Sequence, residues 1–149
     1  MNMVSRTGDR RELLKGPASY GIVITFATLV WWRSVPALFS IVVLCMGDGA
    51  SGLFGPIFGK RKLLWNRSKS LEGSVAFFVF SLLSVVLIHH LFIFMGWTPI
   101  PFTDSTMAMV YYGRVSGAVL LCTVVESLPI KDWDNVTVFI TSALVSHII

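Results

Sequence analysis

Five apolar stretches separated by short polar segments constrain this chain more than any other feature of its sequence. A bilayer core requires about 20 helical residues, and shorter stretches can span it when their ends include glycines and interfacial aromatic residues. Hydrophobic residues make up 54% of the 149 residues and charged ones 13%, which is unusual for a soluble domain. We therefore predict an all-α, multi-pass transmembrane bundle of about five spans, forming one domain over residues 1–149. The stretches are Ala18–Trp32, Val35–Met46, Val75–Met95, Ala108–Val125 and Val136–Ile149.

Basic residues are concentrated in two segments, and this predicts the topology. Of the 12 Lys and Arg residues, nine lie within residues 6–15 and 60–69. By the positive-inside rule both segments face the same, cytosol-like side of the membrane. The third and fourth apolar stretches then cross the membrane outward and back. Residues 126–135 are therefore expected on the same side as the basic inner-face loop 60–74.

The stretch "GDGASGLFGPIFG" at residues 47–59 places an acid and several glycines directly after an apolar run. An acid at the edge of hydrocarbon is a candidate functional residue, here Asp48. If the helix continues, Asp48, Gly52, Gly55 and Gly59 share one face, and the glycines can serve close helix packing. Alternatively, a helix broken at "GDG" would direct its N-terminus and glycine amides at a phosphate.

The loop that follows contains cations and hydroxyl groups suited to phosphate. Lys60, Lys62 and Lys69 directly follow the glycines, and Ser70, Gly73 and Ser74 precede the third span. Cations and backbone donors position a triphosphate and neutralise its charge. The alternative is a positive-inside loop attracted to anionic lipid, and its leucines and Trp65 would let it lie on the membrane surface.

Oxygen ligands gather at the inner end of the fourth stretch. Glu126 follows "CTVV" without a loop, and Asp132, Asp134 and Asn135 come soon after. Such ligands suit Mg²⁺, which binds one or two carboxylates together with substrate phosphates. Capping of the last helix is the alternative for the three later residues. Acids, cations and glycines on one membrane face favour phosphoryl chemistry.

Other polar residues within the apolar stretches have simpler interpretations. Cys45 and Cys122 lack metal or redox spacing and are expected to be small core residues. The neighbouring His89 and His90 point about 100° apart on a helix and are expected to form interhelical hydrogen bonds. The sequence contains no G-x-x-x-x-G-K-[ST] loop, nucleophile elbow or zinc spacing, so a soluble nucleotide-binding fold is not expected.

Four motifs in order resemble the plant phytol kinase and farnesol kinase family, which is related to the dolichol kinases. They are "SRTGDRRELLKGP", "GDGASGLFGPIFGKRKL", "SKSLEGSVAFF" and "VVESLPIKDWDN", and the resemblance covers nearly the whole chain. It implies a multi-pass membrane enzyme, plastidial in plants. Such an enzyme phosphorylates an isoprenoid alcohol such as phytol or farnesol, using CTP or another nucleoside triphosphate (ATP or UTP).

The resemblance assigns roles residue by residue, and the charge argument adds Lys60 and Lys62 to them. Asp48 and Glu126 are the expected catalytic acids. They are also expected metal ligands, with Asp134 and Asn135, for Mg²⁺. The bilayer and the alcohol are the expected partners, and no nucleic acid is expected. The expected phosphate-binding residues are Gly49, Gly55, Gly59, Lys60, Lys62, Lys69, Ser70, Gly73 and Ser74.

The chain also departs from the family pattern. Gly52 and Trp133 stand where plant members often have acids, and family members carry a further N-terminal membrane half. We therefore expect a C-terminal half of the family, as a fragment, a shortened isoform or a degenerate copy. Two alternative functions stay open: a lipid cytidylyltransferase with similar parts, and a catalytically silent membrane protein whose glycine face only packs helices.

Overall fold

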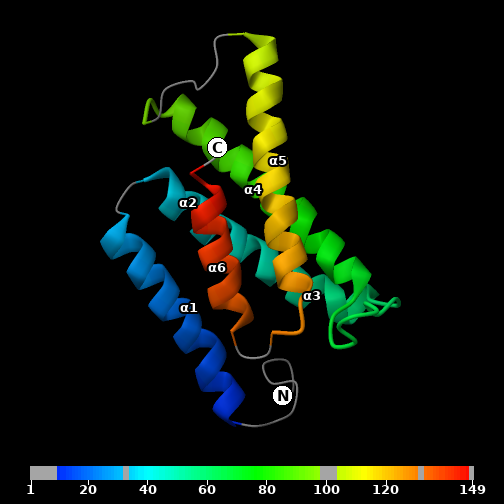
Figure 1. The fold of residues 1–149 in the computed structure, drawn as a ribbon. Coiled ribbons are helices and arrows are strands. Elements are labelled where there is room, and N and C mark those ends of the chain that lie inside the picture. The colour runs from blue at the N-terminus through cyan, green and yellow to red at the C-terminus, as the bar shows by residue number, and fades with distance from the viewer. Residues whose placement is uncertain (1–9, 32–33, 98–103, 131–132, 148–149) are drawn as a thin grey trace.

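The computed structural model describes residues 10–31, 34–97, 104–130 and 133–147, with the side chains of 10–18 left aside. These residues form a helical bundle without named strands (Figure 1). The elements are α1 (Arg10–Val30), α2 (Val35–Val42), the π-helical segment η1 (Val43–Asp48), α3 (Gly49–Phe58), α4 (Leu71–Phe94), α5 (Ser105–Ser127) and α6 (Asp134–Val145). The predicted all-α fold class is confirmed.

Three helices in the described part of the chain are long and apolar enough to cross a membrane. They are Val35–Phe58, which joins α2, η1 and α3, then Leu71–Phe94 and Ser105–Ser127. Ser19–Val30 and Asp134–Val145 are shorter apolar helices, and they match the first and last predicted stretches. Three spans therefore have sufficient length, and the prediction of about five depends on these two shorter helices.

The second span does not end before the glycines. The helix continues from Val35 to Phe58, so the alternative of a helix broken at "GDG" is wrong, and no helix N-terminus faces a phosphate there. Ser34 caps its start, since the Ser34 side chain accepts a hydrogen bond from the amide of Ala37. Pro56 lies inside α3 without ending it.

The glycines of this span do not all face the neighbouring helix. Each residue advances an α-helix by about 100°, so the wider turn of η1 changes the phase of α3 relative to α2, while Asp48 and the glycines of α3 keep regular α-helical spacing. A Cβ on Gly47 would clash with Ser81 Oγ and lie 2.7 Å from the ring of Phe77, whereas one on Gly52 would meet nothing within 4 Å. Gly52 is exposed. Gly52 therefore does not take part in the close packing predicted for that face.

The α3–α4 contact depends on small residues, as the packing interpretation predicted. A Cβ on Gly73 would lie 3.3 Å from Gly55 Cα and 3.5 Å from the carbonyl oxygen of Ser51, and one on Gly59 would lie 2.5 Å from Ser70 Oγ. Small residues allow helices to approach closely in membranes. This approach brings the start of α4 beside α3, and the hairpin that joins them is placed with it.

We expect Gly47→Ala to lower the free energy of unfolding by about 1–3 kcal/mol, the usual cost of overpacking a tight core. Phe77 and Ser81 are both fully buried and cannot retreat from the new methyl group. The matched control is Gly52→Ala, which adds the same atom in open space on the same helix and should leave stability equal or higher. Thermal unfolding of both variants in one detergent tests this, and equal melting temperatures would contradict it.

The core lies where α2, η1, α4, α5 and α6 meet. Its fully buried side chains include Val43, Leu44, Phe77, Val115 and Val119. Helix α1 contacts α2 and α6 on the left of the bundle in Figure 1. Large apolar side chains on the outer faces are exposed, among them Leu83, Leu87, Met109 and Leu120, as expected of helices that face lipid.

Candidate active site

A cavity of about 390 Å³ lies at one end of the bundle, where α3, α4, α5 and α6 begin or end. Figure 1 shows these helix ends in the lower half of the view. The lining residues are Asp48, Ser51, Gly55, Pro56, Lys62, Ser68, Lys69, Ser70, Gly73, Ser74, Glu126 and Asp134. The glycine-acid, lysine-serine and acidic motifs therefore meet at one site, as the topology argument predicted from charge alone.

Lys69 links the two acidic segments across this cavity. Its Nζ donates to Glu126 Oε1 and to the Glu126 main-chain oxygen, both at 2.5 Å. The same atom lies 3.5 Å from Asp134 Oδ2. The hairpin before α4 is thereby tied to the end of α5 and the start of α6. Lys69 is one of the predicted phosphate-binding residues, but in this structure its ammonium group pairs with Glu126 and Asp134.

Glu126 is the most deeply buried acid of the site. The residue is 4% exposed, and its Oε2 has no hydrogen-bond partner among the described residues. A buried carboxylate oxygen without a partner is costly. Because Glu126 lines the cavity, a cation or a hydroxyl group bound there would satisfy this oxygen.

Asp48 is held by a residue that the sequence did not point to. The Tyr20 hydroxyl in α1 donates a hydrogen bond to Asp48 Oδ2, across 28 residues of chain. Tyr20 is the only tyrosine in the stretch 18–32. This polar group in an apolar stretch was the only feature of the sequence that could have indicated a role in the site. Helix α1 therefore takes part in orienting the acid, although none of its described side chains, from Ser19 onward, lines the cavity.

A second unpredicted group anchors the hairpin to α5. Trp65 Nε1 donates to the Ser127 main-chain oxygen at 3.1 Å and lies 3.2 Å from Ser127 Oγ. Asn66 Nδ2 donates to the main-chain oxygens of Ser127 and Leu128 at 3.2 and 3.1 Å. Both bonds reach the residues directly after Glu126. Trp65 and Asn66 therefore support the position of this acid from outside the cavity.

Four of the predicted site residues do not line the cavity. Gly49 is exposed on α3 and Lys60 is exposed after it. Gly59 packs against Ser70, and Asn135 donates its side-chain amide to Ser19 at 3.4 Å. In their place the lining includes Ser51, Pro56 and Ser68. Asn135 is directed to α1 and does not line the cavity, and its metal role stays a prediction.

Helix capping accounts for part of the motif chemistry. Ser70 caps α4, because its side chain accepts from the amide of Gly73 at 3.2 Å. Asp134 Oδ1 accepts from the amide of Asn135 at 3.0 Å at the start of α6, while its other oxygen faces Lys69. Ser70 therefore both caps a helix and lines the cavity. Helix α6 has no side-chain cap at Trp133, and the site role of Asp134 stays a prediction. Asp132 lies outside the described residues.

Among the described side chains, no three His, Cys, Asp or Glu residues are grouped closely enough to hold a metal ion by themselves. The cavity nevertheless contains the carboxylates of Asp48, Glu126 and Asp134. Mg²⁺ commonly takes one or two protein carboxylates and completes its shell with phosphate and water. The donor types fit such an ion once a phosphate is bound.

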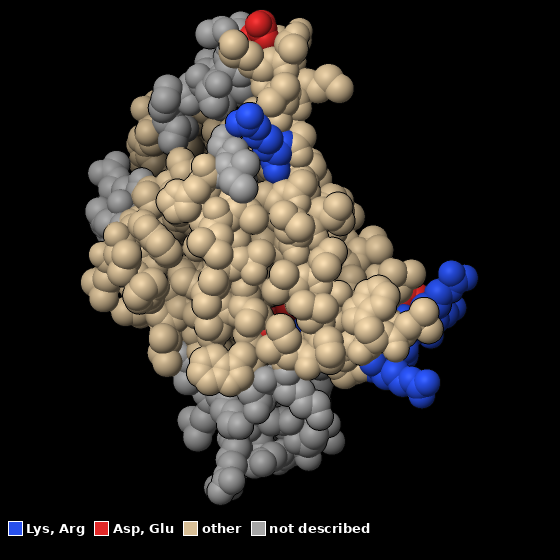
Figure 2. All heavy atoms as spheres, in the orientation of Figure 1, with Lys and Arg blue, Asp and Glu red and all other residues tan. Residues whose placement is uncertain are grey.

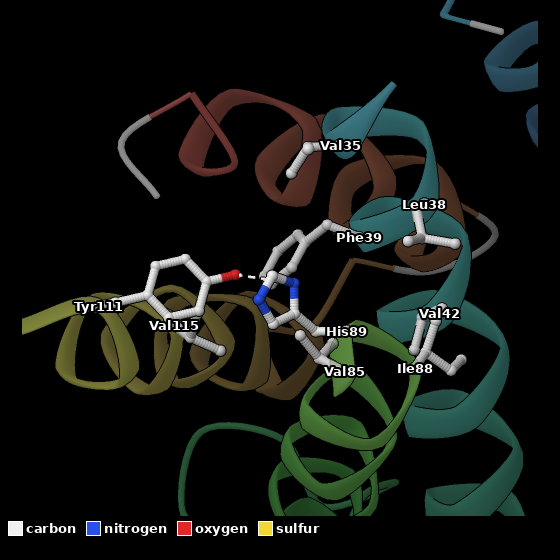
Figure 3. A pocket seen from close by; sticks show the side chains of 9 residues that line it. All are labelled: Val35, Leu38, Phe39, Val42, Val85, Ile88, His89, Tyr111 and Val115. Atoms are coloured by element: carbon white, nitrogen blue, oxygen red, sulfur yellow. Dashed lines mark hydrogen bonds between the residues drawn. The ribbon is translucent and has the colours of Figure 1, made fainter. Parts of the chain in front are cut away.

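A much smaller cavity lies in the apolar part of the bundle. Figure 3 shows it between α2, α4 and α5, lined by His89, Tyr111 and seven apolar residues. Its volume of about 30 Å³ has room for little more than a water molecule. His89 Nδ1 lies 3.3 Å from the Tyr111 hydroxyl, and His90 Nε2 lies 3.2 Å from that of Tyr112. The expected interhelical role of both histidines is confirmed.

We expect Tyr20→Phe to reduce any activity that depends on Asp48 by about 10–100-fold, the scale of losing one hydrogen bond to a charged group. The Phe ring keeps the packing but cannot hold the carboxylate. Turnover of the variant should be compared with that of Tyr112→Phe, which removes a hydroxyl from a tyrosine paired with His90. Equal effects of the two substitutions would contradict a specific role for Tyr20.

Comparison with known proteins gives sequence relatives without a structural template. No family model matches the chain and no solved structure matches it. It is 38% identical over 149 residues to a chloroplastic farnesol kinase of Arabidopsis thaliana, covering 98% of this chain and 46% of that protein. It is 33% identical over 153 residues to phytol kinase 1 of the same plant, covering 97% and 47%.

A third relative gives the same result. A probable phytol kinase 2 of Oryza sativa subsp. japonica, also chloroplastic, is 36% identical over 149 residues, covering 98% of this chain and 47% of that protein. The chain spans about half the length of the curated relatives it matches. It therefore matches the plant phytol kinase and farnesol kinase family, over the C-terminal half of its members.

Proposed function

We propose that this chain forms the phosphoryl-transfer region of an isoprenoid alcohol kinase. It would transfer the terminal phosphoryl group of CTP, or of another nucleoside triphosphate, to the hydroxyl of phytol, farnesol or a similar prenol. The product would be the prenyl monophosphate. The names of the relatives support the class of reaction, and they support a chloroplast membrane as its location.

The observation that carries the proposal is the composition and position of the 390 Å³ cavity. It brings cations (Lys62, Lys69) together with acids at the end of helices long enough to span a membrane. Its volume lies within the range of about 300–1,000 Å³ usual for small-molecule sites. Lysines there would meet nucleotide phosphates as point charges. An apolar alcohol could approach from the bilayer at the same level.

The lipid side of the cavity lies next to α3. Pro56 lines the cavity, while its neighbour Ile57 is 64% exposed on the outer surface of the helix. A prenol whose hydrocarbon chain lies along this apolar surface can therefore present its hydroxyl at the cavity edge. The isoprenoid chain would stay in hydrocarbon, and only the hydroxyl would leave it.

The reaction would be a direct displacement. The alcohol oxygen forms a bond to the terminal phosphorus while the bond from that phosphorus to the bridging oxygen breaks, and the nucleoside diphosphate leaves with that bond's electron pair. The hydroxyl proton passes to a cavity carboxylate. In such reactions positioning and charge neutralisation supply most of the catalysis. Lys62 and Lys69 would neutralise phosphate charge, and Tyr20 would orient Asp48.

Asp48 and Glu126 are the residues that would hold Mg²⁺, with Asp134 beside them. Glu126 Oε2 has no hydrogen-bond partner among the described residues, and all three side chains are carboxylates that line the cavity. Both features fit a hard cation. When bound, Mg²⁺ would neutralise phosphate charge and orient the phosphates.

The test is a labelling assay on membranes that contain the chain. The membranes are incubated with CTP labelled at the γ-phosphate or at the α-phosphate, and with phytol, farnesol or phosphatidate. We expect label from the γ-phosphate alone to appear in a prenyl monophosphate, and membranes without the chain serve as the control. Label from the α-phosphate in a lipid would support a cytidylyltransferase. No transfer from CTP, nor from ATP or UTP labelled at the γ-phosphate, would support a silent membrane protein.

A further inference from the structure

The loop between α3 and α4 is an ordered hairpin. The amide of Leu63 donates to the carbonyl oxygen of Lys69 at 3.1 Å, and that of Leu71 donates to Arg61 O at 2.8 Å. Lys69 N–H closes the tip by donating to Asn66 O at 3.1 Å. The hairpin of residues 60–70 therefore has a defined tip, with Leu64 and Trp65 on it.

The tip is apolar and exposed. Leu64 is 93% exposed and Trp65 is 58% exposed, whereas Leu63 is 6% exposed and holds the base of the hairpin. The polar edge of Trp65 is bonded to Ser127, so its ring stays in one orientation. Such a leucine beside a fixed amphipathic ring is unfavourable in water and suits the boundary between headgroups and hydrocarbon.

Cations surround this apolar tip. Lys60, Arg61, Lys62 and Arg67 are all exposed. Figure 2 shows Lys and Arg side chains gathered at this end of the molecule, while the surface over the helices is mostly uncharged. The hairpin joins Val35–Phe58 to Leu71–Phe94, both long enough to span, so it lies at the level where lipid phosphates lie.

We propose that the hairpin of residues 60–70 docks on an anionic lipid surface. Leu64 and the ring of Trp65 enter the headgroup boundary, and Arg61 and Arg67 meet lipid phosphates. Basic side chains at a membrane surface attract anionic lipid, and apolar neighbours add insertion. The exposed apolar tip favours lipid over a free nucleotide, whose phosphates offer nothing to Leu64. Lys62 and Lys69 instead line the cavity.

Docking also bears on the cavity. The hairpin is bonded to Ser127 through Trp65 and Asn66, and to Glu126 through Lys69. A hairpin held on the membrane keeps these bonds in place. As a consequence that rests on the proposed function, prenol phosphorylation is expected to be several-fold faster in anionic than in neutral bilayers.

The test measures the depth of the tip without requiring turnover. The full chain, with Cys45 and Cys122 replaced by alanine, carries a nitroxide at Leu64→Cys. It is placed in nanodiscs of phosphatidylcholine alone or with 30% phosphatidylglycerol. We expect the ratio of oxygen to nickel-chelate collisions to be at least threefold higher in the anionic discs. In the Arg61→Gln, Arg67→Gln variant this gain should disappear. A label at Met109→Cys, on the exposed face of α5, should be oxygen-accessible in both discs.

Two results would overturn the proposal. A label equally open to the nickel chelate in both discs would leave the tip in water. A label shielded from both oxygen and nickel would place it against protein, such as a second copy of the chain. Adding CTP should leave the collision ratio unchanged, because Arg61 and Arg67 lie outside the cavity. A collapse of the ratio with CTP would assign the arginines to nucleotide instead. Loss of phosphorylation with the ratio intact would count only against the proposed function.

Discussion

Replacing Asp48 with asparagine is expected to lower prenol phosphorylation by about 100-fold or more, the scale of losing one acid-base group or one charge at a reacting phosphate. The amide keeps the size of the side chain and an oxygen that can accept from the Tyr20 hydroxyl. The negative charge in the cavity is lost, together with its ability to hold a cation or a proton. Rates are measured with γ-labelled CTP and phytol in membranes that contain equal amounts of chain.

The matched control for this loss is Gly52→Ala on the same helix. Gly52 is exposed, and an added methyl group meets nothing within 4 Å, so activity should stay within about twofold of the parent, as expected of a surface change that removes no contact. Thermal unfolding of the Asp48→Asn protein should match that of the parent chain. An Asp48→Asn chain that folds normally and phosphorylates at the parent rate would remove Asp48 from the mechanism.

Replacing Lys69 with methionine should both destabilise the chain and inactivate it. Glu126 is 4% exposed, and Lys69 Nζ is its hydrogen-bonded partner at 2.5 Å. Removing one member of a buried ion pair typically costs about 3–5 kcal/mol, because the other charge stays buried without compensation. The same substitution removes a cation from the cavity. The midpoint of thermal unfolding and the labelling assay measure the two effects.

A double-mutant cycle separates the ion pair from general damage. In the Lys69→Met, Glu126→Gln chain no charge is left uncompensated at this pair, so much of the lost stability should return while activity stays absent. Lys60→Met is the matched control, since Lys60 is an exposed lysine outside the cavity, and its stability should be nearly unchanged. Equal stability losses in the single and double variants would show that the pair contributes little.

The position of the candidate site was accessible from the sequence because it depends on charge and length. The positive-inside rule and the count of apolar stretches placed Asp48, the basic loop and Glu126 on one side of the membrane. The number of basic residues in a loop and the length of an apolar stretch can be counted directly from the sequence, without knowing how the helices pack. The 390 Å³ cavity that these residues line in the structure agrees with that deduction.

The helical phase after Met46 was not accessible in the same way. Asp48 and Gly52 are joined by regular α-helix, and Gly52 lies at the exposed edge of their shared face, while η1 (Val43–Asp48) changes the helical phase between α2 and α3. Gly47, Ser51 and Gly55 then face α4. A π-helical turn forms where tertiary packing compensates its weaker geometry, so local propensity does not reveal it.

By itself the sequence determined a helical membrane bundle, the side on which its polar motifs meet and the kind of chemistry they suit. Only the tertiary structure decided which residues touch: Tyr20 with Asp48, Lys69 with Glu126, and Trp65 with Ser127. Hydropathy and charge act through composition and can be read along the chain. These contacts join residues 28 to 62 positions apart. They depend on how closely the helices approach one another. The glycines of α3 and α4 allow that close approach, but only the packed structure shows which residues it brings together.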